Sequence, residues 1–238
     1  MPSDYFKVGL IVPSSNTVME PDFHRALGQE CAISTARIYL EQVTRDSEKS
    51  MIEDDLPNAL RLIKTTEPHV VVFGCTSAGS LGGLESDAGI ARRIEQLTGA
   101  GGLTVVGSVV EQLKAIGPRR VAVFTPYEEE LTLSVAQCVA DAGYQLAKTA
   151  GMGIRSNRDI GRVTAGEIVE FVDAQIKGVD ADCIFLSCTN WQAIDAIAPV
   201  AARLGLPVIS SNQAAIAAVR ARMAGVGHLQ TASRRAAE

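Results

Sequence analysis

The chain lacks the features that mark several large protein classes in sequence. Of its 238 residues, 22 are Lys or Arg and 27 are Asp or Glu, which gives a formal net charge of −5. A chain with this balance has no basic surface for nucleic acid or for an anionic membrane. No run reaches the roughly 20 apolar residues of a membrane span, and the first residues lack a signal peptide's regions. We therefore expect a cytoplasmic protein without nucleic-acid or membrane partners.

Cysteine and histidine are sparse, and their spacing excludes several kinds of site. Five cysteines, an odd number without paired spacing, do not form a disulfide framework, and no C-x-x-C pair indicates a redox dithiol. The three histidines, His24, His69 and His228, are scattered and lack the ligand spacing of a zinc site. No phosphate-binding or dinucleotide-binding glycine motif follows an apolar run. We expect no metal and no cofactor.

Short apolar runs alternate with helical patterns along the whole chain. This alternation is typical of parallel sheets covered by helices on both faces. The predicted strands lie near residues 7–12, 31–40, 70–73, 103–106, 121–125, 144–150, 183–186 and 206–210. The predicted helices lie near residues 17–27, 46–65 with a break at Pro57, 88–98, 108–116, 127–142, 165–176, 193–204 and 212–223. The segments 77–89 and 151–163, rich in glycine and polar residues, are predicted to be loops.

The pattern repeats once, which indicates an internal duplication. Pro13 and Pro126 end equivalent strands and are 113 positions apart, as are Cys75 and Cys188. A third match, between the runs that begin at Leu103 and Leu206, has an offset of 103. We therefore predict two pseudo-symmetric, doubly wound α/β domains, each with a parallel sheet of about four strands. The predicted domains are 1–110, rejoined by a C-terminal helix 211–225, and 111–210, with a flexible tail at 226–238. The active site is expected in the interdomain cleft, where small-molecule sites preferentially occur.

Cys75 and Cys188 each follow an apolar run at the end of a predicted strand. Ligands bind just beyond the carboxyl ends of parallel strands, so both thiols are candidates for catalysis. Cysteine is often only a small buried hydrophobe, which suits Cys31, Cys138 and Cys183. Two opposed thiols can act on the two faces of one carbon centre if one is a thiolate, which a helix N-terminus would favour. A cysteine hydrolase would need a histidine base, and neither His24 nor His69 falls at a predicted strand end.

Polar residues near the same strand ends can bind a carboxylate. Ser14 and Asn16 follow the first strand, Tyr127 takes the place of Ser14 in the repeat, and Asn157 lies in the polar loop. Hydroxyl and amide groups are suitable donors to a carboxylate. The alternatives are a helix cap for Asn16, core packing for Tyr127 and a turn for Asn157. Thr17 and Glu20 have capping-box spacing, which predicts a cap by Thr17.

Taken together, these motifs resemble the aspartate/glutamate racemase superfamily, in particular its maleate cis–trans isomerase and arylmalonate decarboxylase branch. The resemblance covers nearly the whole chain and lies in Gly9–Thr17, Cys75–Ser77, Thr125–Tyr127, Asn157 and Ser187–Asn190. It is greatest to maleate isomerases. It implies two α/β domains with the site between them, Cys75 as nucleophile or base and Cys188 as the opposing acid. It further implies that Asn16, Tyr127 and Asn157 bind and orient a carboxylate. We also expect substrate binding by their neighbours at the strand ends, Ser14, Thr76, Ser77, Thr189 and Asn190.

Two details of the resemblance bear on the substrate. The decarboxylases lack the first cysteine, so the Cys75–Cys188 pair argues against that activity. The segment Thr189–Trp191 differs from maleate isomerases and looks more like relatives associated with ectoine breakdown. We expect an isomerase acting on maleate or a similar cis-enedioate. An amino-acid racemase using the same cysteines and a non-catalytic small-carboxylate binding protein stay open as alternatives. The expected partners are a small dicarboxylate or amino-acid substrate and, as a homo-oligomer, a second copy in a dimer.

Overall fold

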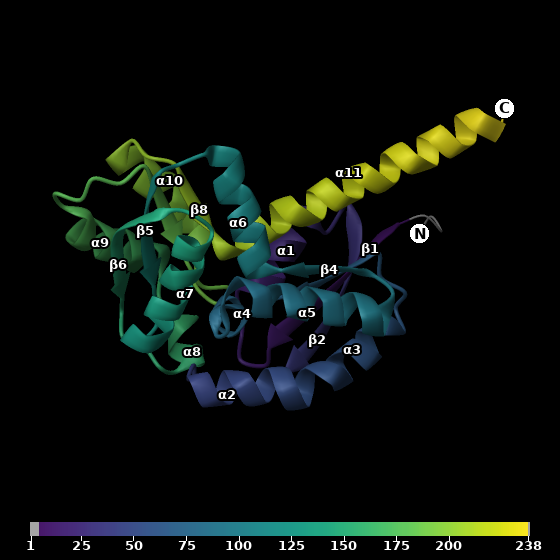
Figure 1. Ribbon diagram of the computed structural model, residues 1–238, viewed down its shortest axis with the longest axis horizontal. Coiled ribbons are helices and arrows are strands. Elements are labelled where there is room, and N and C mark those ends of the chain that lie inside the picture. The colour runs from purple at the N-terminus through teal and green to yellow at the C-terminus, as the bar shows by residue number, and fades with distance from the viewer. Residues whose placement is uncertain (1–4, 238) are drawn as a thin grey trace.

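The computed structural model describes residues 5–237, with side chains for residues 5–225. Strands and helices alternate throughout (Figure 1). The strands are β1 (Phe6–Pro13), β2 (Cys31–Ile38), β3 (Val70–Phe73), β4 (Gly101–Thr104), β5 (Arg120–Thr125), β6 (Gln145–Gly151), β7 (Cys183–Leu186) and β8 (Val208–Ser210). The helices are α1 (Met19–Leu27), α2 (Arg45–Ser50), the π-helical turn η1 (Met51–Asp55), α3 (Leu56–Lys64), α4 (Thr76–Ser80), α5 (Gly83–Thr98), α6 (Val105–Ile116), α7 (Glu129–Asp141), α8 (Asn157–Ile160), α9 (Ala165–Ile176), α10 (Ala193–Leu204) and α11 (Ser211–Ala237).

The strands form two parallel sheets with the same topology. The first has the order β2-β1-β3-β4 and the second the order β6-β5-β7-β8. Val8 pairs with Val70 in the first sheet, and Val121 pairs with Cys183 in the second, so both partners shift by the predicted 113 positions. Apolar strands β3 and β7 are completely buried in the centre of their sheets. The predicted pair of α/β halves is confirmed.

The third predicted match, at an offset of 103, is wrong. Thr104 faces Phe73 in the first sheet and Ser210 faces Leu186 in the second, so the equivalent positions are 106 apart. Phe73 and its partner Thr104 are 31 positions apart, whereas Leu186 and Ser210 are 24 apart, and this difference of seven changes the offset. The run Leu103–Gly107 resembles the run that begins at Leu206, but the two are not equivalent in the fold. β4 ends at Thr104, and Val105 already begins α6.

Several predicted boundaries also differ from the structure. The segment 77–89, expected as a loop, holds α4 and the first part of α5, and α8 lies inside the expected loop 151–163. Glycine and serine in 77–89 lower helix propensity, but α4 is fully buried, so packing overrides propensity there. The expected break near Pro57 occurs as η1, after which the proline occupies the first turn of α3.

Helix α11 begins at the end of β8 and packs against α6 and α1 of the first half. Figure 1 shows it, in yellow, running from the second half across the first. The predicted limits at 1–110 and 111–210 stay a prediction, and the tail expected at 226–238 lies outside the residues whose side chains are described. Within the described part of the chain, every helix is too short or too polar to cross a membrane.

Candidate active site

Cys75 lies two residues beyond β3, at the N-cap of the short helix α4, and only 5% of it is exposed. The residue before it, Gly74, has no side chain because α1 and β1 approach closely. A Cβ there would stand 2.6 Å from Met19 Sδ and 2.8 Å from the carbonyl oxygen of Ile11. Gly74 therefore allows the chain to turn from β3 into α4 while α1 packs against it.

Cys188 takes the same place after β7 in the second half and is 3% exposed. Its sulfur accepts a hydrogen bond from the backbone N–H of Asn190 at 3.3 Å. The hydroxyl of Tyr127 and the backbone N–H of Trp191 also bond to it. Tyr127 follows β5, the strand beside β7, and is 2% exposed. The structure therefore brings Cys188 and Tyr127 into contact, as expected from their strand ends.

The two thiols share one buried region. A negative charge on Cys188 would raise the pKa of Cys75, and a charge on either thiol would raise the pKa of Tyr127. Burial raises the pKa of Cys75 far above its usual range. Burial also raises the pKa of Cys188 to about 12, although the Tyr127 hydroxyl and backbone N–H groups favour its thiolate. Desolvation is the largest influence on both thiols, so burial favours their neutral form in this closed arrangement.

A buried carboxyl group, Glu48 on α2, joins the thiols. Ser77, two residues after Cys75, donates its hydroxyl proton to Glu48 Oε1, and its Oγ lies 3.7 Å from Cys75 Sγ. Glu48 is 0% exposed, and its Oε2 has no hydrogen-bond partner in the described part of the chain. Burial raises the pKa of Glu48 to about 8, against the opposing effects of Ser77 and Arg45.

Sequence reasoning missed Glu48. The stretch Arg45–Ser50 is polar at every position, which is typical of an exposed helix. The only local signal is the cap at Thr44, whose side chain accepts a hydrogen bond from the Ser47 N–H and fixes where α2 begins. A cap places the helix but does not show which of its polar side chains turns inward. The inward position of Glu48 therefore depends on how α2 packs in the folded protein and cannot be inferred from the local sequence.

Asn16 joins the two halves beside the thiols. Its Oδ1 accepts hydrogen bonds from the N–H groups of Val18 and Met19, so it caps α1. Its Nδ2 donates to Thr189 Oγ1 at 3.0 Å, and Thr189 in turn donates to the carbonyl oxygen of Gly74 at 3.0 Å. The cap predicted at Thr17 is wrong, because the N-cap position is Val18 and the Asn16 amide reaches the helix N–H groups instead.

Asn157 and Asn190 form a second polar link between the halves. Asn190 accepts the Thr17 N–H at 2.9 Å and donates to the carbonyl oxygen of Asn157 at 2.6 Å. Asn157 donates to Ser15 Oγ at 2.8 Å. Gly161 lies against the Asn190 amide, where a Cβ would be 3.1 Å from it. This amide is thus tightly enclosed.

The side chains of the remaining predicted residues also form hydrogen bonds with other protein groups. Thr76 donates to Ser211 Oγ at 2.9 Å, and the Ser14 hydroxyl accepts the Leu40 N–H at 3.1 Å. The structure therefore sorts the predicted residues into two sets. One set consists of the two thiols and the hydroxyl groups beside them, namely Cys75, Ser77, Tyr127 and Cys188. The other holds the halves and nearby segments together and consists of Ser14, Asn16, Thr76, Asn157, Thr189 and Asn190.

Backbone bonds also connect the two halves near Asn157. The Val43 N–H donates to the carbonyl oxygen of Arg155 at 2.8 Å, and the Asn157 N–H donates to that of Glu41 at 3.1 Å. The segment 41–43 of the first half is thus paired with 155–157 of the second. With both thiols almost wholly covered, the structure represents a closed arrangement of the site.

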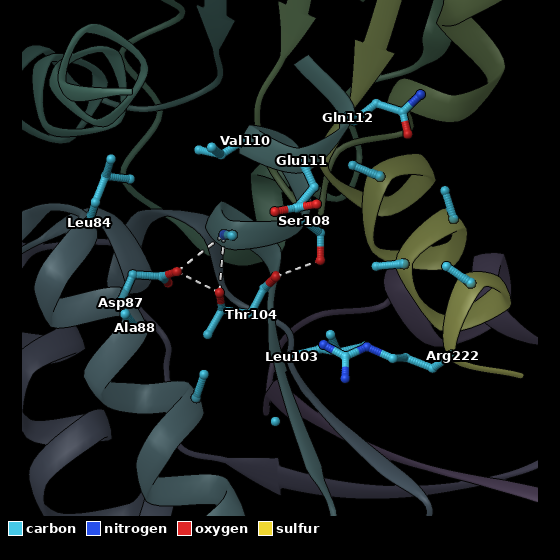
Figure 2. A pocket seen from close by; sticks show the side chains of 17 residues that line it. Leu84, Asp87, Ala88, Leu103, Thr104, Ser108, Val110, Glu111, Gln112 and Arg222 are labelled. Carbon is cyan, nitrogen blue, oxygen red and sulfur yellow. Dashed lines mark hydrogen bonds between the residues drawn. The ribbon is translucent and has the colours of Figure 1, made fainter. Parts of the chain in front are cut away.

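A cavity of about 600 Å³ lies away from the cysteines. Figure 2 shows it between α5, α6 and α11, with Asp87 and Thr104 on one side and Arg222 on the other. Among the described residues, no three His, Cys, Asp or Glu side chains gather as a metal site would require. His69 accepts the Lys7 N–H at the amino end of β3, the end opposite Cys75, so it cannot serve as a base there.

Comparison of the chain with known proteins identifies the family to which it is similar. The family model described as arylmalonate decarboxylase matches residues 8–235. The chain is 30% identical to the arylmalonate decarboxylase of Bordetella bronchiseptica over 208 residues, covering 87% of this chain and 86% of that protein. It is 26% identical to the maleate isomerase of Geobacillus stearothermophilus over 221 residues, 87% of each chain.

A solved structure shows that the whole fold is shared. It is a mutant of the Nocardia farcinica maleate cis–trans isomerase, with a covalently bound succinylcysteine intermediate. The two chains superpose with a TM-score of 0.84 at 21% identity, over 92% of each. The match of the family model to almost the entire chain, together with the shared fold, confirms the predicted resemblance. The chain therefore belongs to the arylmalonate decarboxylase family, whose matched relatives are enzymes.

Proposed function

We propose that this protein is a cofactor-independent isomerase that converts maleate, or a similar cis-enedioate, into the trans isomer. The observation that carries the proposal is the pair of cysteines at equivalent strand ends, buried together with Tyr127. A decarboxylation needs one proton donor, whereas addition to an alkene followed by protonation needs a nucleophile and an acid. Two thiols supply both groups.

In the proposed reaction, the sulfur of Cys75 forms a bond to one alkene carbon. The π electrons move to the second carbon, which takes the proton of Cys188, and the resulting thiolate accepts hydrogen bonds from Tyr127 and the Asn190 N–H. The former double bond is now a single bond and rotates. Cys188 then removes the other hydrogen of that carbon as a proton, the Cys75 sulfur leaves and regains its own proton, and the trans alkene forms.

The relatives support this reaction. The matched relative from Geobacillus stearothermophilus is a maleate isomerase, and the Nocardia farcinica enzyme carries a succinylcysteine, the adduct that such an addition gives. In our proposal Cys75 bears this adduct here. The amides of Asn16 and Asn157 are the proposed carboxylate donors, which requires them to exchange the protein partners that they hold in the closed arrangement.

The test is a proton-NMR assay of the purified protein with maleate, aspartate, glutamate and arylmalonates. We expect loss of the maleate signal and growth of the trans-isomer signal. Conversion of an amino acid into its mirror image, with solvent deuterium entering at Cα in deuterated water, would instead establish a racemase. Binding that raises the melting temperature without turnover of any of these compounds would establish a binding protein.

A further inference from the structure

We propose that Glu48, acting through Ser77, accepts the proton that Cys75 loses when its sulfur attacks the substrate. This inference rests on the proposed addition chemistry. In this proposal Cys75 contacts the substrate. Glu48 does not contact it and acts on Cys75 by holding the proton that the thiol loses.

The geometry forms a continuous path from thiol to carboxyl. Cys75 Sγ lies 3.7 Å from Ser77 Oγ, within reach of a sulfur hydrogen bond, and the Ser77 hydroxyl already donates to Glu48 Oε1. A serine hydroxyl can accept one proton while it donates another. No large movement is needed for the proton to pass along this path.

A neutral, buried thiol needs such an acceptor. Cys75 is covered by protein, and burial suppresses its ionisation, so the reactive thiolate is scarce in the resting site. Bulk water cannot take the proton directly from a side chain that is 5% exposed. Glu48 is the carboxyl group linked to Cys75 by hydrogen bonds through a single residue.

Burial of Glu48 without full pairing indicates a role beyond packing. Its Oε2 lacks a hydrogen-bond partner in the described part of the chain, and an unpaired buried polar atom costs about 1–3 kcal/mol. A residue with only a structural role could be replaced by an apolar side chain at no such cost. The same carboxyl has room for a proton on Oε2.

The transfer balances in atoms and charge. The Cys75 S–H proton moves to Ser77 Oγ as the Ser77 proton moves to the ionised Glu48 carboxylate. The sulfur electron pair forms the new S–C bond, the π pair takes the Cys188 proton, and the negative charge passes from Glu48 to Cys188. Elimination reverses each transfer and restores the resting state.

The groups around Glu48 determine how it titrates. Cys75 from the end of β3, Cys188 from the end of β7 and Tyr127 from the end of β5 face it, and Arg45 lies near it on α2 itself. The three facing groups are neutral at pH 7 to 8, so Arg45 is the charged neighbour that favours the carboxylate. With the Glu48 pKa at about 8, the ionised acceptor becomes more abundant as pH rises through 8.

The first experiment measures alkylation of Cys75 by iodoacetamide between pH 6 and 10, resolved by peptide mass spectrometry. This readout needs no substrate. In the wild type we expect the rate to rise through pH 8 and level off. In Glu48→Gln, which keeps an oxygen for Ser77 to donate to, and in Ser77→Ala, we expect that rise to be lost.

The second experiment measures kcat for maleate over the same pH range. We expect Glu48→Gln to lower kcat at pH 8 by about 100-fold or more, the usual range for loss of general acid–base assistance. Glu53→Gln, the same change at an exposed residue of η1, is the matched control and should leave both profiles unchanged.

The outcomes separate the two proposals. Wild-type profiles in Glu48→Gln would overturn the role of Glu48, even if maleate is turned over. A wild type that does not act on maleate, but whose Cys75 alkylation rises through pH 8 only while Glu48 is present, would overturn the proposed function and leave the proton path standing.

Discussion

The two halves of the molecule carry a cysteine at the same strand-end position, but they surround it differently. Cys75 has Ser77, the Ala78 N–H and, through Ser77, a carboxyl group as neighbours. Cys188 has the Tyr127 hydroxyl and the N–H groups of Asn190 and Trp191. The second set consists of donors, which stabilise a thiolate once it has formed. The first contains a proton acceptor. In our proposal, therefore, Cys75 loses its proton to the protein, whereas Cys188 at the equivalent position donates its proton to the substrate.

The largest expected effect comes from removing each cysteine in turn. Cys75→Ala should abolish maleate turnover, because no other described side chain takes its place as nucleophile. Cys188→Ser should lower turnover by about 10²–10⁴-fold, the range for loss of a general acid. Incubation with maleate followed by mass spectrometry should find an adduct on Cys75 in Cys188→Ser and none in Cys75→Ala. Near wild-type turnover in both variants would refute the two-thiol mechanism.

Glu48, the carboxyl group that Ser77 links to Cys75, should also affect the stability of the protein. The folded-state pKa of Glu48, about 8, exceeds its unfolded value near 4.5, so the folded state retains a proton that the unfolded chain loses. The free energy of unfolding should therefore fall between pH 4.5 and 8, by up to about 5 kcal/mol at 1.36 kcal/mol per pKa unit.

Urea titrations of the wild type and Glu48→Gln at several pH values measure this contribution. The difference between their free energies of unfolding should change with pH only inside that window, since glutamine does not titrate. A constant difference from pH 4.5 to 8 would show that Glu48 has an ordinary pKa in the folded protein.

On the Cys188 side, the informative change is Tyr127→Phe. It keeps the buried ring and removes the hydroxyl that bonds to the sulfur. Hydrogen bonds to charged groups contribute about 1.5–3 kcal/mol, so kcat should fall by about 10- to 100-fold. The pKa of Cys188, measured by the pH dependence of its alkylation in Cys75→Ala, should rise. Unchanged alkylation would mean that Tyr127 only packs.

The smallest effects concern Gly74 and Ser187, which occupy equivalent places before the two cysteines. Gly74→Ala puts a methyl group against Met19 and the Ile11 carbonyl and should cost about 1–3 kcal/mol of stability. Ser187→Ala removes a buried hydroxyl that has no hydrogen-bond partner in the described structure, so stability should stay equal or increase slightly. Thermal unfolding compares them, and equal losses would contradict the described packing around Gly74.

The fold was predictable because strand burial leaves a strong pattern. The apolar runs before Cys75 and Cys188 identify central strands, and the 113-residue offset of the two pairs reveals the repeat. Local similarity failed at Leu103, where the difference of seven in the spacing of the paired residues moved the true match. Insertions of this kind leave no mark in a single sequence.

The candidate site was predictable where it coincides with strand ends and not elsewhere. Cys75, Tyr127 and Cys188 follow strands, and the structure brings them together. Glu48 lies on a wholly polar helix, and its burial depends on the packing of α2 against α4. For Asn16 the structure shows the alternative role, a helix cap, and its bond to Thr189 joins residues 173 positions apart, which no local pattern reveals.

The duplication within a single chain has an evolutionary consequence. Two identical half-length chains related by a two-fold axis would give both cysteines the same neighbours, because symmetry repeats every contact. Such a dimer could not reserve a carboxyl for one thiol and a tyrosine for the other. Once the halves are encoded in one gene, each strand end can mutate alone, as Gly74 and Ser187 show. Covalent fusion is therefore what allows a symmetric scaffold to hold an asymmetric pair of thiols.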